Sequence, residues 1–299
     1  MSPTSSRELR AWEAADFRSE YDPTIELRAT DDFNVSSVLG MPIAMVDQTS
    51  FTRIVSDWLS RRTTATPGQY INFRDVHGVV RALNEPALAD AHRRAFMNVP
   101  DGRPLVWIGK LRGYNVEQVC GPDTLPAVCN AGLSHGWRHA FLGGTPSVLE
   151  ALVTKLKATH SGLEVVEAIS PPFRPLSDQE TEALIARLVA AKPDFLWVGL
   201  GCPKQELWMA QHASRIPGTI SMGVGAAFDF HAGMVRRAPV WVRRLGFEFF
   251  YRALQEPKRL VRRYAAVIPQ FLVQITKEEL KLRTTKSSET LKAPADLNR

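Results

Sequence analysis

The chain has few cysteines and no long apolar run. It contains 299 residues and three cysteines, Cys120, Cys129 and Cys202, which form no Cys-x-x-Cys pair. This usage is typical of a reducing compartment, where thiols stay reduced. No window of about 18 uninterrupted apolar residues occurs, so we expect no bilayer-spanning helix. The first residues do not resemble a signal peptide, and we therefore expect a cytoplasmic protein.

Several motifs of metal, hydrolase and dinucleotide chemistry are also absent from the sequence. No Asp-x-Asp occurs, the arrangement that commonly holds a divalent ion against a diphosphate, and the seven histidines lack zinc-ligand spacing. We therefore expect neither a metal site nor a cofactor. No Gly-x-Ser-x-Gly supports nucleophilic hydrolase chemistry. The lack of a complete Gly-x-Gly-x-x-Gly disfavours a nucleotide-cofactor-dependent oxidoreductase, which we keep as an alternative.

Short apolar runs alternate with amphipathic stretches along most of the chain. The expected strands are 42–46, 70–73, 139–142, 163–166, 195–198 and 219–222, and the expected helices are 51–61, a long segment ending at 96, 146–159, 177–191 and one starting near 204. This alternation predicts an α/β fold, a Rossmann-like and mostly parallel sheet with helices on both faces. We expect a mobile leader (1–38), the α/β core (39–238), a C-terminal helical appendage (239–282) and a disordered tail (283–299).

Glycines follow three of the expected strands, directly before a helix. They are Gly143 and Gly144, Gly199 and Gly201, and Gly223 and Gly225. Such glycines let backbone N–H groups approach phosphate oxygens at the carboxyl edge of a parallel sheet, where helix N-termini add positive charge. We expect these glycines to bind substrate together with Thr145 and Lys204, at the starts of the following helices. The alternative is that the glycines only make tight turns.

The stretch from 236 to 263 carries most of the positive charge of the chain. It has nine basic residues against Glu248 and Glu256, a net charge of +7 in a chain whose total is +6. Aromatic residues such as Trp241 are interleaved with the arginines. This combination predicts helices, broken near Gly246 and Pro257, that bind a diphosphate or an anionic membrane surface. A solvated helix face and a non-enzymatic lipid- or nucleic-acid-binding protein are the alternatives.

Two aspartates, Asp101 and Asp229, are expected close to the carboxyl edge of the sheet. Asp101 stands in the turn sequence 98–102, and a carboxylate at the mouth of the sheet could act as the base for a sugar hydroxyl. Turn chemistry alone also explains an Asp-Gly pair after proline. Asp229, close to the last glycine turn, is expected to bond local amides.

Several blocks of sequence resemble the WecG/TagA/CpsF family of bacterial glycosyltransferases (glycosyltransferase family 26). The matching blocks are 100–107, 141–148, 170–173, 193–208, 223–239 and 250–264. The resemblance implies a fold of the GT-E type, no metal and a membrane-docking appendage. It implies inverting transfer of a hexose or N-acetylhexosamine from a UDP-sugar, UDP-ManNAc-like or UDP-glucose-like, to a polyprenyl-diphosphate-linked sugar.

The resemblance also assigns expected roles to single residues. Asp101 matches the proposed catalytic base, and Gln205 matches a residue near the nucleotide-sugar. The arginines that match those thought to close over the site and hold the diphosphate are Arg252, Arg259 and Arg262. Two departures fall near the sugar pocket: Phe73-Arg74-Asp75 replaces Thr-Leu-Asn, so that only Asp75 can stand for the Asn, and Gln118 stands where an Arg is usual.

Together these features predict a metal-independent hexosyltransferase of cell-surface polysaccharide or exopolysaccharide assembly. We expect its partners to be a UDP-sugar, a lipid-linked oligosaccharide precursor and the inner face of the plasma membrane, where it would be a peripheral protein. We expect no nucleic acid partner, and we leave a homo-oligomer open. The sequence does not identify the donor sugar, the acceptor sugar or the linkage.

Overall fold

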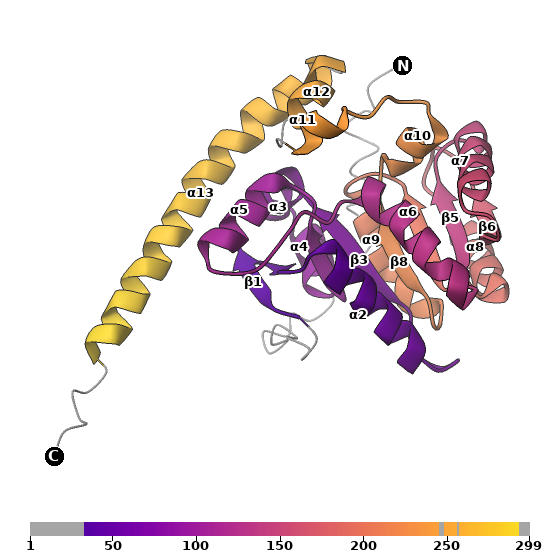
Figure 1. Ribbon diagram of the computed structural model, residues 1–299, viewed down its shortest axis with the longest axis horizontal. Coiled ribbons are helices and arrows are strands. Elements are labelled where there is room, and N and C mark those ends of the chain that lie inside the picture. Colours follow the sequence, from indigo (N-terminus) through magenta and orange to yellow (C-terminus); the bar gives the residue numbers. More distant parts are fainter. Residues whose placement is uncertain (1–32, 245–247, 256, 293–299) are drawn as a thin grey trace.

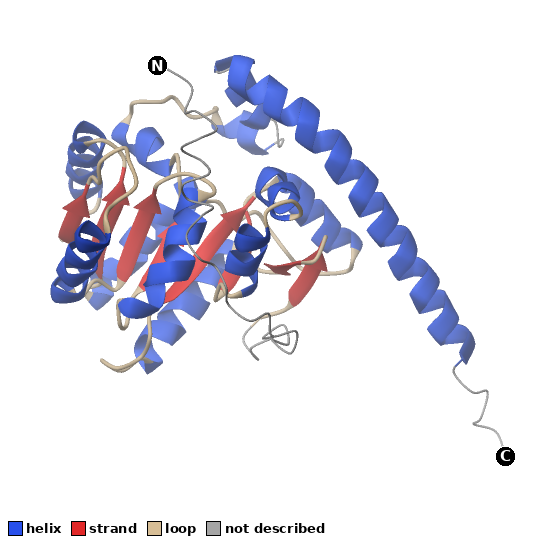
Figure 2. Cartoon of the chain, turned by 180° about the vertical axis from the view of Figure 1, so that it is seen from behind, coloured by secondary structure: helices blue, strands red, loops and turns tan. Residues whose placement is uncertain are grey.

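A six-stranded parallel sheet forms the centre of the computed structural model, which describes residues 33–244, 248–255 and 257–292 (Figures 1 and 2). Its strands lie in the order β4-β3-β8-β7-β5-β6. They are β3 (Gln69–Arg74), β4 (Met97–Pro100), β5 (Arg138–Gly143), β6 (Glu164–Ile169), β7 (Phe195–Gly199) and β8 (Ile220–Gly223). The expected Rossmann-like α/β fold is confirmed.

Helices cover both faces of this sheet. The first face carries α8 (Asp178–Ala191) and α9 (Lys204–His212), and the second carries α2 (Gln48–Arg61), α6 (Gly121–Gly132), α7 (Pro146–Thr159) and α10 (Ala227–Ala232). The helices that follow the neighbouring strands β5 and β7 therefore pack on opposite faces. Such a divergence opens a crevice at the carboxyl ends of the two strands, the usual place for a ligand in an open α/β sheet.

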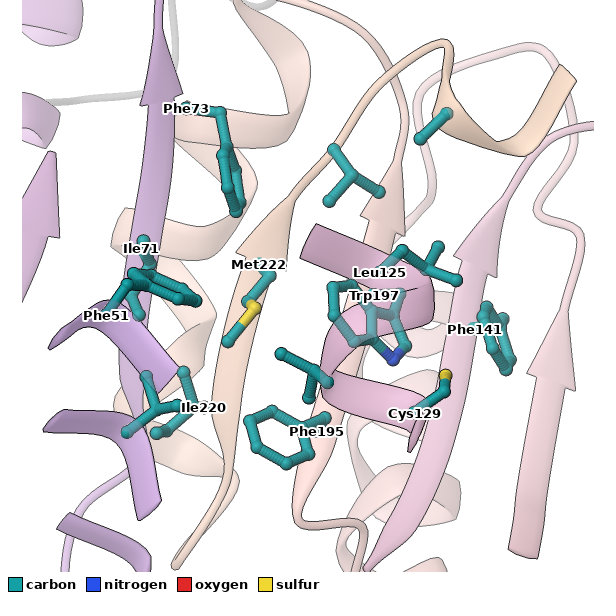
Figure 3. Close-up of a cluster of buried hydrophobic side chains, with 14 of the residues drawn as sticks. Phe51, Ile71, Phe73, Leu125, Cys129, Phe141, Phe195, Trp197, Ile220 and Met222 are labelled. Carbon is teal, nitrogen blue, oxygen red and sulfur yellow. The ribbon is translucent and has the colours of Figure 1, made fainter. Parts of the chain in front are cut away.

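The main core is built around large aromatic side chains from the central strands. Trp197 of β7 is fully buried between Met222 of β8 and Phe141 of β5 (Figure 3). Its indole Nε1–H donates a hydrogen bond to His139 Nδ1 at 3.1 Å, so the one polar atom of the ring is satisfied. Apolar runs buried on both faces are what a parallel sheet requires, and they produce the strand pattern seen in the sequence.

The C-terminal segment forms three helices, α11 (Val240–Arg244), α12 (Glu248–Gln255) and α13 (Pro257–Lys292). The first two lie on the side to which the strand arrowheads point (Figure 2). Helix α13 runs down the side of the molecule (Figure 1) and buries Phe271 and Ile275 in a second apolar cluster. Arg112 pairs there with Glu278 and Glu279, each at 2.6 Å. The appendage is therefore packed onto the core along part of its length.

That second cluster also contains a small antiparallel hairpin of β1 (Val35–Val38) and β2 (Met41–Ala44). The expected leader ended at 38, but β1 already belongs to the folded part. The turn residues Leu39 and Gly40 both have positive φ, 51° and 79°, the geometry of a tight two-residue hairpin turn. Residues 1–32, the rest of the expected leader, lie outside the described residues.

Three other boundaries differ from the sequence prediction. The long helix expected up to residue 96 is two helices, α3 (Val76–Ala82) and α4 (Pro86–Arg93), because Pro86 lacks the N–H that would continue α3. Strand β4 and the helices α5 (Arg103–Leu111), α6 and α10 were not expected. Helix α13 extends through residue 292, beyond the expected end at 282, because a helix elongates at little cost once formed and residues 283–292 include good helix formers. Residues 293–299 lie outside the described residues.

Candidate active site

Asp75 and Asp101 are neighbours at the carboxyl edge of the sheet. Strands β3 and β4 are parallel and in register, with Arg74 opposite Pro100, so each acidic residue comes one position after its strand ends. Asp75 caps helix α3, and its Oδ1 accepts a hydrogen bond from the Gly78 N–H at 2.8 Å. Asp75 thus has a clear structural role in addition to its expected place in the sugar pocket.

The backbone of Asp101 is held on two sides. Its N–H donates to the Arg74 carbonyl at 2.8 Å, and its own carbonyl accepts a hydrogen bond from Gln118 Nε2 at 2.5 Å. None of these contacts uses the carboxyl group. Gln118, the departure from the family pattern, therefore braces the peptide that presents the Asp101 side chain. The fold thus fixes the peptide that carries this carboxyl, and the contacts that fix it leave the carboxyl oxygens unused.

The surroundings of Asp101 raise the pKa of its carboxyl to about 7. Burial contributes most to this rise in pKa. The residue is only partly exposed, and the loss of surrounding water disfavours the charged form of the carboxyl. The negative charges of Asp75 and Glu248 raise the pKa further, and Arg74 and Arg237 offset part of the effect. A carboxylate with a pKa near the working pH suits a general base better than an ordinary aspartate does.

A pocket of about 250 Å³ lies two strands away, at the ends of β5 and β7. Its lining includes four of the expected substrate-binding residues, Gly144, Thr145, Gly199 and Lys204. The remaining wall is largely apolar and includes the loop 171–173 and Trp208, with Asp229 at one side. Thr145 also caps α7, where its Oγ1 accepts a hydrogen bond from the Val148 N–H at 3.3 Å. The pocket therefore combines an apolar wall with the N-terminal turns of two helices.

Gly201 and Gly223, both at this edge, are required to be glycine for different physical reasons. Gly201 has φ +78°, a left-handed geometry that glycine adopts without strain, and its N–H and carbonyl are both hydrogen-bonded to Gln205. A Cβ on Gly223 would come within 2.7 Å of Met209 and 3.0 Å of Gln205. Gly201 is thus needed for the turn and Gly223 for packing, and their expected contact with substrate stays a prediction.

Gln205 lies beneath the edge and joins the two halves of the site. Its side chain is only 4% exposed. The amide Nε2 donates to the Gly223 carbonyl at 2.9 Å and to Glu206 Oε1 at 3.0 Å, and Oε1 accepts from the Gly201 N–H at 3.2 Å. With both amide hydrogens used, Gln205 acts on the shape of the glycine edge. Its expected direct contact with the nucleotide-sugar stays a prediction.

A buried ion pair that the sequence did not suggest completes the network. Arg74 is 3% exposed, pairs through Nη2 with the fully buried Glu206, and contacts His92 Nε2 through Nη1 at 3.0 Å. Burial, followed by the positive charge of Arg74, lowers the pKa of His92 to about 2, so this ring is neutral. The only sequence signal was a charged residue inside a strand that is otherwise buried.

The appendage is anchored next to this edge by an ionic network. Asp123, in the first turn of α6, accepts from Arg237 Nη2 at 2.9 Å and from Arg243 Nη1 at 3.1 Å. Arg237 also donates through Nε to Glu248 at 3.0 Å. Burial opposes ionisation of Asp123, but hydrogen bonds from Arg237 and Cys120 lower its pKa to about 2. These contacts hold α11 and α12 beside Asp101.

The three arginines expected to clamp the diphosphate lie in the appendage helices α12 and α13. Arg252 is in α12, and Arg259 and Arg262 are in the first turns of α13. Arg262 is exposed, and the side chains of Arg252 and Arg259 lie outside the described residues. Their clamping role stays a prediction. Among the described residues, no group of three or more His, Cys, Asp or Glu side chains is placed to hold a metal ion.

Comparison with known proteins identifies the family of the chain. The family model "Glycosyl transferase WecG/TagA/CpsF family" matches residues 36–285, which is most of the chain. The chain belongs to this family. The match extends from the β1–β2 hairpin to within α13, so the appendage is part of the family pattern.

Two curated members of the family are similar to the chain over part of their lengths. Both are described as N-acetylglucosaminyldiphosphoundecaprenol N-acetyl-beta-D-mannosaminyltransferases. The protein of Staphylococcus aureus (strain MW2) is 34% identical over 146 residues, 49% of this chain and 55% of the relative. The protein of Bacillus subtilis (strain 168) is 28% identical over 188 residues, 62% of this chain and 70% of the relative. The chain thus spans about half the length of the first of these.

Proposed function

We propose that the chain is a glycosyltransferase that moves a hexose or N-acetylhexosamine from a UDP-sugar to a polyprenyl-diphosphate-linked sugar. The observation that carries the proposal is the Asp101 carboxyl, whose peptide is braced at the same sheet edge as a glycine-rimmed pocket. Family membership and the names of the two relatives support the substrate class. The pathway would be the assembly of a cell-surface polysaccharide.

In the proposed mechanism, Asp101 removes the proton from an acceptor hydroxyl. The acceptor oxygen then attacks the anomeric carbon of the donor while the bond from that carbon to the diphosphate oxygen breaks, so that UDP leaves and the configuration inverts. The backbone N–H groups at the starts of α7 and α9, with Lys204, would stabilise the leaving diphosphate. The apolar wall of the pocket would hold the nucleoside.

The same proposal places the protein at the cytoplasmic face of the membrane as a peripheral enzyme. Near the basic residues of the appendage, Trp241 is 66% exposed and Leu254 is 81% exposed. Apolar side chains beside arginines suit insertion into an anionic headgroup layer. The helices in the described part of the chain include none that is both long enough and apolar enough to span a bilayer. Binding to vesicles of anionic phospholipid should weaken in the variants Trp241→Glu and Leu254→Glu.

The decisive experiment is a transfer assay with a panel of UDP-sugars and a synthetic polyprenyl-diphosphate-linked N-acetylglucosamine. One UDP-sugar should support transfer to the lipid, and the product should have the inverted anomeric configuration. The variant Asp101→Asn serves as the control that links turnover to the site. If no UDP-sugar in the panel yields a lipid-linked disaccharide or raises the melting temperature of the protein, the proposal is wrong.

A further inference from the structure

The buried pair Arg74–Glu206 occupies the space between the two halves of the sheet edge. Both side chains are almost completely removed from solvent, with 3% and 0% exposure. Within the described residues, Arg74 Nε and Glu206 Oε2 have no hydrogen-bond partner, so the pair is only partly satisfied. Burying two charges is costly, and an apolar pair of similar volume is often at least as stable. Stability alone is therefore a poor reason for this pair.

On one side, Arg74 is joined to the candidate base through its backbone. Its carbonyl accepts hydrogen bonds from the N–H groups of both Asp101, at 2.8 Å, and Gly102, at 3.1 Å. The Arg74 side chain leaves the same residue toward the interior, where it pairs with Glu206. Any displacement of Arg74 would therefore move the peptide that presents the Asp101 carboxyl.

On the other side, Glu206 is joined to the glycine edge. Its Oε1 accepts from Gln205 Nε2 at 3.0 Å, and Gln205 in turn bonds the Gly201 N–H and the Gly223 carbonyl. These two glycines follow β7 and close β8, on the side of the sheet edge that leads to the pocket. A continuous chain of contacts thus runs from Asp101 through Arg74, Glu206 and Gln205 to Gly201.

We propose that the Arg74–Glu206 pair is a positioning element that keeps Asp101 aligned with the donor-binding glycine edge. The inference rests on the proposed function, because it takes Asp101 as the base and the glycine edge as the donor side. The two charged residues touch no reacting atom in this scheme. They act through the Arg74 carbonyl and the Gln205 amide, and a misalignment of about 1 Å can cost on the order of 100-fold in rate.

The test separates the charge of the pair from its geometry. In Glu206→Gln, the amide oxygen can still accept from Arg74 and Gln205, so the maximal kcat should stay within about twofold. The unneutralised Arg74 should favour the carboxylate form of Asp101, so the acid limb of the kcat/KM profile should move to lower pH. The double variant Arg74→Met with Glu206→Leu loses the side-chain contacts that link Asp101 to the glycine edge. Its kcat should therefore fall by roughly tenfold or more.

A matched control is the ion pair Arg62–Asp194, at the opposite, amino end of the sheet. Asp194 accepts from Arg62 and, at 2.6 Å, from the Arg138 N–H. Asp194→Asn should lower the melting temperature without changing the pH profile or the kcat of the folded enzyme. A folded double variant with wild-type kcat, or a Glu206→Gln enzyme with an unmoved acid limb, would overturn the positioning role.

The Asp101 carboxyl can also be titrated directly by carbon NMR in the wild type and in Glu206→Gln, with Asp101→Asn identifying its signal. This measurement needs no substrate. A downward movement in Glu206→Gln would support the coupling even if no UDP-sugar were transferred. An unchanged titration in an enzyme that does transfer sugar would overturn the positioning role and leave the proposed function intact.

Discussion

The two halves of the carboxyl edge are built in different ways. At the ends of β3 and β4 the edge is crowded with charge: Asp75, Asp101 and, from below, Arg74 with Glu206. At the ends of β5 and β7 it is hollow, with glycines, an apolar wall and three charged lining residues, Arg174, Lys204 and Asp229. One sheet therefore offers a carboxyl with a displaced pKa in one place and space for a ligand in another.

This difference suggests a division of labour between chemistry and binding. Charges close together perturb each other's pKa, which a base requires, but they would also repel or compete for an anionic donor. Helix N-termini and open glycine backbone attract phosphate without titrating. Separating the two halves by one strand lets each keep the electrostatic environment it needs, while Gln205 connects them.

The strongest test of the charged half is Asp101→Asn. Because the amide cannot take a proton from the acceptor, we expect kcat to fall by about 10²- to 10⁴-fold, with little change in UDP binding. Steady-state kinetics and a thermal-shift titration with UDP measure the two effects. Because the pKa of Asp101 is raised, its ionised carboxylate costs the folded wild type free energy above pH 7. The melting temperature of Asp101→Asn at pH 8 should therefore not fall below that of the wild type. Wild-type turnover in a folded variant would remove Asp101 as the base.

A second test concerns His139, buried in β5 below the hollow half. Burial, followed by the charge of His160, lowers its pKa from 6.5 to about 4. The unfolded chain binds the proton more readily, so the contribution of His139 to the free energy of unfolding should be largest above pH 6.5 and should drop by up to about 3 kcal/mol as the pH falls toward 4. Denaturant unfolding between pH 4 and 7.5 measures the total loss, to which His92 and His212 also contribute because burial lowers their pKa values. The loss should be smaller in His139→Gln by the share of His139. An equally steep loss in His139→Gln would assign it to another group.

A third test concerns Lys204 in the hollow half. Lys204→Ala should raise the KM for the donor by about tenfold with kcat nearly unchanged, because it removes a charge used for binding and not for proton transfer. Folding should be unaffected, since a positive charge at a helix N-terminus is unfavourable. Initial rates over a range of donor concentrations measure the change, and exposed Lys157 on α7 supplies the control variant Lys157→Ala. A fall in kcat at constant KM would contradict the division between the halves.

The smallest expected effect concerns Asp75. Its negative charge raises the pKa of Asp101, so Asp75→Asn should move the acid limb of the kcat/KM profile to lower pH by up to about one unit. Activity should still rise as the pH passes through the pKa of Asp101, because the carboxylate is the active form. The asparagine oxygen can still cap α3, so the unfolding free energy should change little. An acid limb that does not move would show that Asp75 does not influence the base.

Much of the architecture was predictable because it follows from local patterns. The runs at 139–142 and 195–198 became β5 and β7, and the helix expected over 177–191 is α8, which Ser177 and Glu180 begin with a capping box. Strand β4 was missed because four residues with an asparagine among them read as a turn. Its pairing comes from β3, and the Asn98 side-chain amide donates there to the carbonyls of Pro42, 56 residues away, and of His92, at 2.9 and 2.8 Å.

Of the candidate site, the sequence by itself determined which residue types stand at the strand ends: the glycines, Asp75 and Asp101, and the lysine that opens α9. These positions follow from backbone periodicity and turn chemistry, which neighbouring residues set. Only the tertiary structure decided that Arg74 meets Glu206, 132 residues away, and that Glu248 approaches Asp101. Burial and charge interactions depend on distances across the folded chain, and no spacing along the sequence encodes them.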